Sequence, residues 1–214
     1  MMRLTPVVKN LVIINVIIFI VWQVAGAVSP DMLHFMKSYF FLYKVGPIWQ
    51  RFTFPEGFGF EPVQVVTSFF SHQGIMHIAF NMLALASLGP AVESALGSKR
   101  FLAFYLFTGV AASLLIMFLD PSPFKVLGAS TAISGVIAAF AYIYPRAPLS
   151  FFFLPPFEAK KFAIGIAVLS AVLVLAELRG FGNAGGISHF GHLMGMVAAV
   201  IYFYAEKYLP FLPK

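Results

Sequence analysis

The sequence contains no cysteine and few charged residues, since Asp, Glu, Lys and Arg make up only 10% of its 214 residues. A typical soluble domain is about one-quarter charged, so water cannot be the solvent for most of this chain's surface. The lack of cysteine excludes a thiol nucleophile and thiolate metal ligands. Aspartate occurs only at Asp31 and Asp120, and no acidic residue lies well inside an apolar stretch. A proton relay through buried carboxylates is therefore disfavoured.

Apolar residues are abundant instead, at 60% of the chain with a mean hydropathy of +0.90. Crossing the bilayer core takes about 20 mostly apolar residues. The sequence predicts six such membrane helices in a single all-α domain covering 1–214, at approximately 8–28, 74–92, 101–119, 127–145, 161–178 and 187–206. The first block resembles a signal peptide, but its apolar stretch is longer than a usual signal core, and we expect a retained helix.

The net charge is +6, but no basic stripe with interleaved aromatic residues is present, so we expect no nucleic-acid partner. Lys and Arg sort by side of the membrane instead, and the more basic side should be cytoplasmic. This places both termini in the cytoplasm, on the side that holds Arg3, Lys9, Lys99, Arg100, Arg146, Lys160, Lys161, Lys207 and Lys214.

One long connection, about 29–73, separates the first two predicted helices. We expect it to lie in the membrane interface, where aromatic rings settle. Its aromatic residues include Phe35, Tyr39, Phe40, Phe41, Tyr43, Trp49, Phe52, Phe54, Phe58 and Phe60. The segment 179–186 is rich in glycine and is either a mobile loop or a tight turn.

Strongly polar residues within membrane helices are functional candidates, because placing them there is costly. A hydroxyl nucleophile, a base and oxyanion donors are all available. Ser130 follows Gly128 where a helix should begin, which leaves free amide groups beside it. His192 lies at a comparable depth in the last helix, and His77 and Asn81 share one helix face. A set of metal ligands is not evident. A structural role for these residues, or a transporter or channel, remains open at this point.

Four segments around these residues resemble the rhomboid family of intramembrane serine proteases. His72 to Asn81 is similar to the family's second-helix signature, and the segment 89–97 to the end of that helix. Gly128-Ala-Ser130 resembles the Gly-x-Ser of the catalytic helix, and the segment 189–195 resembles the sixth-helix motif, in which a histidine precedes glycine by three.

The resemblance implies a catalytic dyad in which Ser130 is the nucleophile and His192 the base. It implies that His77, Asn81 and the Gly128–Ser130 backbone form the site for the oxyanion and substrate. It also implies that Gly195 permits close packing of the helices that carry the dyad. No metal and no cofactor is expected.

Three departures from the family pattern affect this interpretation. Thr131 replaces the glycine that usually follows the nucleophile, and Ser134 replaces an aromatic ring that commonly packs on the histidine. Ser134-Gly135 is also a rival nucleophile motif. Val63-Gln64 replaces a Trp-Arg pair. None of these changes removes a catalytic atom.

The sequence thus predicts an endopeptidase that cleaves single-span membrane proteins within the bilayer, from a site that opens to the outer side. The alternatives are an inactive rhomboid-like protein that binds membrane clients, and a small transporter. We expect a multi-pass protein of a bacterial inner membrane, with the fifth helix and the 179–186 loop acting as a gate. The sequence does not predict the oligomeric state.

Overall fold

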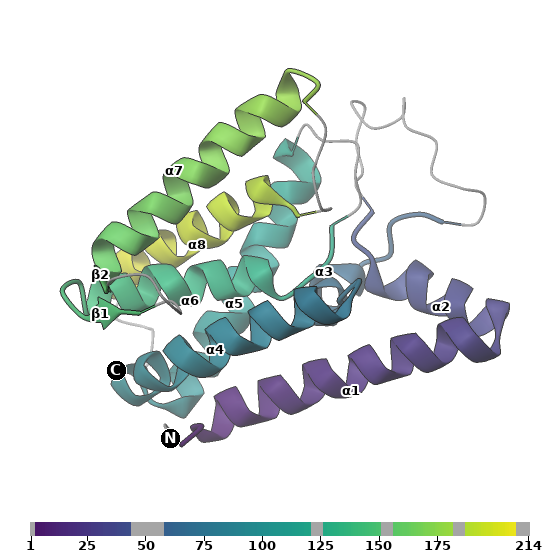
Figure 1. Cartoon of the computed structure of the whole chain (residues 1–214), viewed down its shortest axis with the longest axis horizontal. Helices are drawn as coiled ribbons and strands as arrows, with labels where there is room; N and C mark the ends of the chain where they lie inside the picture. Colours follow the sequence, from purple (N-terminus) through teal and green to yellow (C-terminus); the bar gives the residue numbers. More distant parts are fainter. Residues whose placement is uncertain (1–2, 44–57, 121–125, 151–155, 182–186, 209–214) are drawn as a thin grey trace.

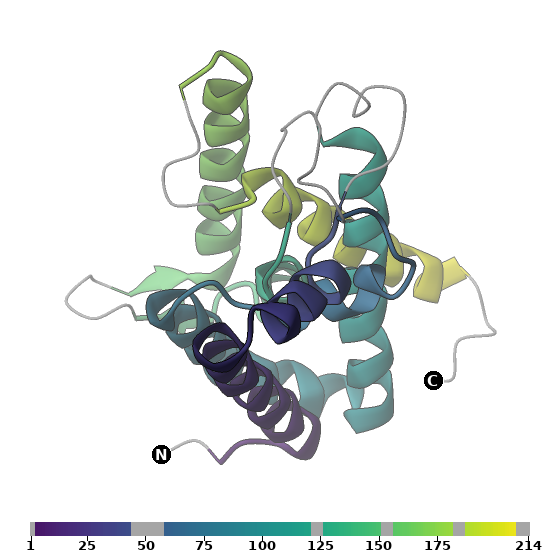
Figure 2. The same cartoon turned by 90° about the vertical axis from the view of Figure 1, so that its right-hand side faces the viewer.

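The computed structural model describes residues 3–43, 58–120, 126–150, 156–181 and 187–208, and it is mostly helical. Long helices run back and forth between two ends of a bundle (Figure 1). The end that carries the N-terminus, the α4–α5 junction and two short strands is called here the inner end, and the opposite end the outer end. Figure 2 shows that the helices surround a central element, α6. The elements are α1 Pro6–Val28, α2 Pro30–Phe40, α3 Gln64–Thr67, the 3₁₀ helix η2 Ser68–Phe70, α4 Ile75–Leu96, α5 Ser98–Leu119, α6 Ser130–Ile143, β1 Pro148–Leu149, β2 Phe157–Glu158, α7 Ala159–Leu178 and α8 His189–Tyr208.

Each of the six predicted apolar blocks coincides with one long helix, with ends that shift by a few residues. Four helices are long and apolar enough to cross a membrane by length and composition: α1, α4, α5 and α7. The fourth block gives a shorter helix than predicted, because α6 has only 14 residues. Gly128 delays its start with a φ of 113°, and Pro145 disfavours helical geometry at the preceding Tyr144. The structure therefore confirms four of the six predicted spans by this criterion.

Helix α6 lies in the middle of the bundle, where α4, α5 and α8 pack around it. Helix α6 is one of the most apolar segments of the chain, yet most of its residues are buried against neighbouring helices and not exposed on the outside of the bundle. Helix α7 lies at the edge, and many of its large apolar side chains are exposed, as expected for a helix that faces lipid. The purely α-helical prediction misses one feature. Strands β1 and β2 form a small antiparallel ladder at the inner end, with Pro148 paired to Glu158.

Helix α1 is tied to the bundle at the inner end by one buried carboxylate. Glu93 of α4 accepts hydrogen bonds from the Thr5 hydroxyl (2.5 Å) and from the backbone amides of Val7 (3.1 Å) and Val8 (2.9 Å). It also accepts one from the Ser98 hydroxyl at the start of α5 (2.6 Å). Because the carboxylate is 2% exposed, these donors replace its lost hydration. Glu93 therefore joins three helices.

The described part of the long first connection folds into α2, α3 and η2. Gln64 is fully buried and holds this region together, since its carbonyl oxygen accepts from the Tyr43 amide (3.1 Å) and its NH₂ donates to the carbonyls of Ser38 and Gly59 (both 2.7 Å). Trp22 of α1 stacks on Phe41 with ring centroids 5.0 Å apart. The connection is thus packed against the helices, whereas its predicted place in the membrane interface stays a prediction. Trp49, Phe52 and Phe54 lie outside the described residues.

Candidate functional site

Ser130 is the first residue of α6, as the Gly-x-Ser pattern predicts. The approach to it is fixed by two neighbouring segments. The Gly128 amide donates to the Ser68 carbonyl of η2 (2.9 Å), and Leu42 and Val126 exchange backbone hydrogen bonds of 2.9 and 3.2 Å. The first turn of a helix leaves amide groups without intrahelical acceptors and carries the positive end of the helix dipole. Ser130 is half-buried at a position suited to stabilise developing negative charge.

Gly128 brings His77 of α4 beside Ser130. A Cβ built on Gly128 would lie 2.8 Å from both Cε1 and Nε2 of His77 and 3.7 Å from Ser130 Oγ. The imidazole therefore rests on the bare α carbon of Gly128, and the serine hydroxyl borders the same space. The φ of 113° also lies in a region that side chains rarely adopt. Two independent constraints thus require glycine at this position.

His77 and Asn81 lie one turn apart on α4, so the structure places them on one face as predicted. Asn81 is buried, and His77 is half-buried. The ring of His72, in the turn before α4, meets the His77 ring edge-on, with centroids 5.0 Å apart. Burial, followed by the neighbouring His77, lowers the pKa of His72 to about 4. His72 is therefore neutral near pH 7, and it supports the side chain of His77.

His192 lies in the first turn of α8. Its amide donates to the Ser188 carbonyl (3.1 Å), and the Ser188 hydroxyl accepts from the Gly191 amide (3.0 Å), so Ser188 caps the start of the helix. The imidazole is half-buried. The His189 ring meets the His192 ring edge-on, with ring centroids 6.0 Å apart. The N-terminal turns of α4, α6 and α8 thus bring their polar residues to one part of the bundle.

Two glycines of α8 set how closely it packs on α6. A Cβ on Gly195 would lie 2.0 Å from the Thr131 carbonyl oxygen and 3.3 Å from the Ser134 Cβ. A Cβ on Gly191 would lie 2.8 Å from Thr131 Cγ2. Small residues allow this approach, as the family resemblance implied for Gly195.

The same contacts locate two of the three departures from the family pattern. The Thr131 methyl group faces Gly191, and its hydroxyl donates to the Gly128 carbonyl (3.3 Å). Ser134 is buried where α6 meets Gly195. Ser134 lies one turn inside the helix, away from the free amide groups of the first turn that lie beside Ser130. Both residues therefore belong to the contact between α6 and α8.

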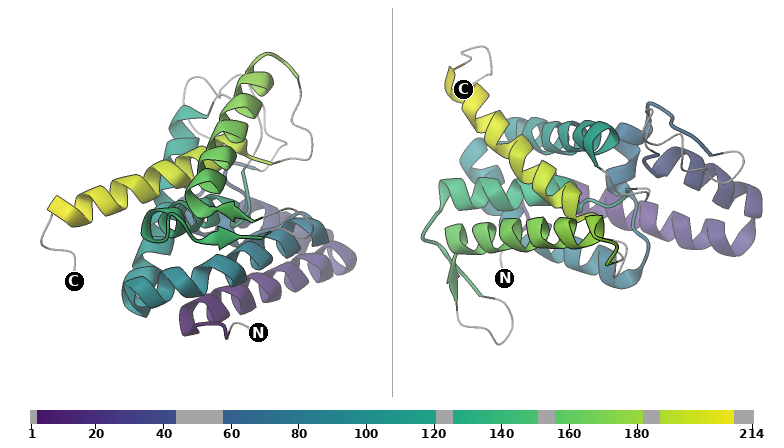
Figure 3. Two further views of the ribbon diagram at one scale, coloured as in Figure 1. Left: turned by 60° about the vertical axis from the view of Figure 1, so that its left-hand side comes forward. Right: turned by 90° about the horizontal axis from the view of Figure 1, so that it is seen from above.

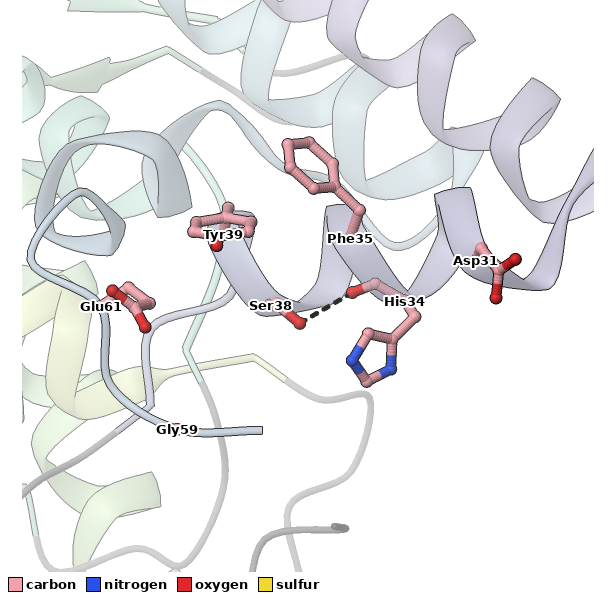
Figure 4. A pocket seen from close by; sticks show the side chains of 7 residues that line it. All are labelled: Asp31, His34, Phe35, Ser38, Tyr39, Gly59 and Glu61. Atoms are coloured by element: carbon pink, nitrogen blue, oxygen red, sulfur yellow. Dashed lines mark hydrogen bonds between the residues drawn. The ribbon is translucent and has the colours of Figure 1, made fainter. Parts of the chain in front are cut away.

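Metal chemistry gains no support from the residues that the structure describes. Within them, no three His, Cys, Asp or Glu side chains come close enough together to hold a metal ion. A separate hollow of about 290 Å³ lies at the outer end, between α2 and the segment 59–61 (Figure 4). Its polar side chains are Asp31, His34, Ser38, Tyr39 and Glu61, and Ser130 does not line it.

Two interactions near the site were not found by sequence reasoning. One is the set of hydrogen bonds made by Gln64, because nothing in a sequence shows that a residue of a predicted loop will be fully enclosed. The other joins α7 to α8, where His189 Nε2 lies 3.8 Å from Glu177 Oε1. A carboxylate at the end of the fifth predicted block and a histidine at the start of the sixth were the available signals. The remainder of the predicted gate loop, 182–186, lies outside the described residues.

Comparison with known proteins identifies the family. A model of the Rhomboid domain matches residues 59–208. The chain is 30% identical to Rhomboid protein 1, mitochondrial, of Saccharomyces cerevisiae, over 91% of this chain and 52% of that protein. It is 37% identical to Rhomboid protease GluP of Bacillus subtilis, over 63% of this chain and 24% of the relative. It is 27% identical to Presenilin-associated rhomboid-like protein A, mitochondrial, of Danio rerio, over 91% of this chain and 46% of that protein.

These relatives also bear on the expected location. Two of the three are mitochondrial by name, so the predicted bacterial inner membrane gains no support from them. The chain spans about half the length of these two relatives and about a quarter of the Bacillus protein. The apolar helices and the relatives agree on a protein embedded in a membrane. On the match to the Rhomboid domain and these relatives, the chain belongs to the rhomboid family.

Proposed function

We propose that this chain is an intramembrane serine endopeptidase that hydrolyses peptide bonds in or near the transmembrane segments of single-span proteins. The observation that carries the proposal is the position of Ser130, which begins α6 beside a glycine whose bare surface holds His77. A nucleophile at a helix start, with a hydrogen-bond donor across a glycine, is the arrangement that acyl transfer needs. The relative named Rhomboid protease GluP supports the same chemistry.

The reaction follows from the assigned roles. Ser130 Oγ attacks the scissile carbonyl carbon while His192 accepts its proton. The oxyanion receives hydrogen bonds from His77, Asn81 and the Ser130 amide. The C–N bond then breaks, and His192 gives the proton to the leaving amine. Water hydrolyses the acyl-enzyme with the same base, which restores the serine. No carboxylate is assigned to orient His192, so the machinery is a dyad.

The length of α6 supports a site below the membrane surface. Fourteen residues of helix span about 21 Å, whereas the apolar core of a bilayer is about 30 Å thick. If the inner end of α6 reaches the inner boundary, Ser130 lies about 10 Å inside the outer one. In this proposal 1–214 is one domain of six spans with both termini in the cytoplasm, and water reaches the site from the outer side.

The substrate enters from the lipid, past α7. Only 11% of the apolar window of α7 is buried, compared with 44% for α4 and for α5, so moving α7 breaks fewer contacts than moving α4 or α5. Its outer end is linked to α8 by the Glu177–His189 contact. A substrate helix must unwind to present a peptide bond, so segments with glycine should be preferred.

Cleavage of a tagged single-span protein in liposomes tests the proposal. Wild type should cut it, and Ser130→Ala and His192→Ala should each remove the activity. Ser134→Ala, which truncates a buried hydroxyl one turn away, is the matched control and should retain cleavage. Loss of cleavage in Ser134→Ala alone would move the nucleophile to that residue. Binding of the substrate by wild type without cleavage would instead favour a client-binding protein.

A further inference from the structure

A groove between α6 and α7 opens near the inner end of the bundle. Its volume is about 380 Å³, and its walls are almost entirely apolar, with Ala138 and Tyr142 on α6 and Ala163, Ile164 and Ala167 on α7. Tyr142 is 69% exposed and Ile164 53% exposed, so the groove lies on the face that a membrane protein turns to lipid. The view from above in Figure 3 shows α6 and α7 side by side, with the two strands at their inner ends.

Positive charge gathers where this groove reaches the inner end. Lys160, in the first turn of α7, lines the groove itself. Lys161 is its neighbour, and Arg146 follows the end of α6. Lys161 forms an ion pair with Glu158 (2.7 Å), and the Lys160 amide donates to the Pro145 carbonyl (3.0 Å), so the residue after Pro145, Arg146, lies beside the start of α7. The Lys161 contact first, and then Arg146 and Lys160, lower the pKa of Glu158. Three cations and one carboxylate therefore lie in this region, which leaves an excess of positive charge at the mouth.

A second groove on the other side of Tyr142 provides a comparison. It lies between α6 and α8, has a volume of about 210 Å³, and is lined by Val200, Phe203 and Tyr204, with Lys207. The Tyr142 ring packs on Phe203 with centroids 4.9 Å apart and so separates the two grooves. Both grooves have apolar walls, and one lysine lines each of them, Lys207 in the α6–α8 groove and Lys160 in the α6–α7 groove. At the α6–α7 groove, Arg146 and Lys161 lie next to Lys160 and add to its charge.

We propose that the α6–α7 groove binds an anionic phospholipid, with an acyl chain along Ala138, Ala163 and Ala167 and the phosphate at Lys160 and Arg146. The alanine side chains in the walls leave space for an acyl chain, whereas larger side chains would fill that space. Basic pockets between membrane helices at the cytoplasmic boundary favour anionic headgroups, as the charge complementarity requires here. A soluble anion would match the cations but would leave the apolar walls uncovered.

This inference adds a ligand site that is separate from the peptidase chemistry and does not depend on it. The groove is formed by α6, which carries Ser130, and by α7, the least enclosed of the candidate spans. A lipid that fills it contacts both helices near the inner end, where the Lys160 amide already donates to the Pro145 carbonyl (3.0 Å). Bound lipid should therefore stabilise the position of α7 against α6.

Native mass spectrometry of the full chain, exchanged into detergent with equimolar phosphatidylglycerol and phosphatidylcholine, tests the site. Wild type should retain phosphatidylglycerol preferentially. Each of Arg146→Gln and Lys160→Gln should lower that preference roughly fivefold, because one basic residue at a membrane surface attracts anionic lipid by about that factor. Ala167→Phe, which fills the groove, should lower the retention of both lipids. Inorganic phosphate in excess should not displace the lipid.

Two variants serve as matched controls. Lys99→Gln removes an exposed charge from the inner end of α5, and Val200→Phe fills the α6–α8 groove. Both should bind phosphatidylglycerol as wild type does. If Lys99→Gln lowered the preference for phosphatidylglycerol as much as Lys160→Gln does, general surface charge would explain the effect and the proposal would be overturned. Equal retention of the two lipids by wild type, or unchanged retention in Ala167→Phe, would also overturn it. Far-ultraviolet circular dichroism confirms that each variant is folded.

Discussion

Gly195 of α8 lies directly against the carbonyl oxygen of Thr131 in α6. A Cβ at position 195 would be 2.0 Å from that oxygen, a separation that no side chain can adopt. The obstacle is backbone, so it cannot rotate away as a side chain would. This contact fixes the spacing between the helix that carries Ser130 and the helix that carries His192.

Gly195→Ala should therefore push α8 away from α6. We expect a loss of about 3 kcal/mol in stability from overpacking and a fall in cleavage rate on the order of a hundredfold, because a displacement near 1 Å is enough to misalign a base and its nucleophile. Thermal unfolding in detergent and cleavage in liposomes measure the two effects. Gly165→Ala, in α7 where a Cβ meets open space, is the control and should keep the wild-type stability and cleavage rate. Wild-type activity in Gly195→Ala would contradict the proposed role of this contact.

Gly128→Ala should reduce cleavage strongly while leaving the bundle folded. The added methyl group would meet the His77 ring at 2.8 Å, and the φ of 113° adds a backbone strain of about 1–2 kcal/mol. Gly97→Ala separates these two effects, because Gly97 also has a positive φ, of 78°, but has nothing near its Cβ position. Cleavage should survive in Gly97→Ala. Equal loss in both variants would show that strain, rather than displacement of His77, causes the effect.

Glu93→Ala should destabilise the protein without touching the candidate site. It removes the acceptor for four donors at the junction of α1, α4 and α5, and the buried amides of Val7 and Val8 lose their partner. We expect a cost of roughly 3 kcal/mol or more in unfolding free energy. Ser94→Ala, at the exposed neighbouring position, should change it by about 0.5 kcal/mol at most. Similar unfolding temperatures for the two variants would contradict this account of α1 anchoring.

His72 should make the folded state sensitive to acid. Its pKa is about 4 in the folded protein and 6.5 ordinarily, so between these values the unfolded chain binds a proton that the folded chain does not. Stability should therefore fall as the pH drops from about 6.5 to 4, by on the order of 2–3 kcal/mol, and level off below. His72→Gln should flatten this part of the unfolding profile, and His34→Gln, at an exposed position, should not. An unchanged profile in His72→Gln would assign the acid sensitivity to other groups.

The helices could be predicted because membrane spans depend on long apolar runs, which are visible in a sequence. The start of α6 at Ser130 was also predictable, since Gly128 interrupts the run just before it. The length of α6 was overestimated because apolar residues continue past the point where Gly128 and Pro145 limit the helix. Apolar content alone does not separate a helix that spans from one enclosed by its neighbours.

The sequence proposes the residues of the candidate site, but it does not predict the contacts between them. Resemblance to a family named Ser130, His192, His77 and Asn81, but no pattern showed that His77 would rest on Gly128. Contacts such as Glu177 with His189 depend on how α7 and α8 cross, and that geometry comes from packing across the whole bundle. The enclosure of Gln64 by backbone carbonyls has the same origin.

Covalent labelling tests the central claim, that Ser130 is the nucleophile activated by His192. A fluorophosphonate probe transfers its phosphonyl group to an activated serine Oγ with loss of fluoride, and peptide mass spectrometry then locates the adduct. The account predicts an adduct on Ser130 in wild type and in Ser134→Ala, and none in His192→Ala. An adduct on Ser134, or labelling of Ser130 that is unchanged in His192→Ala, would contradict it.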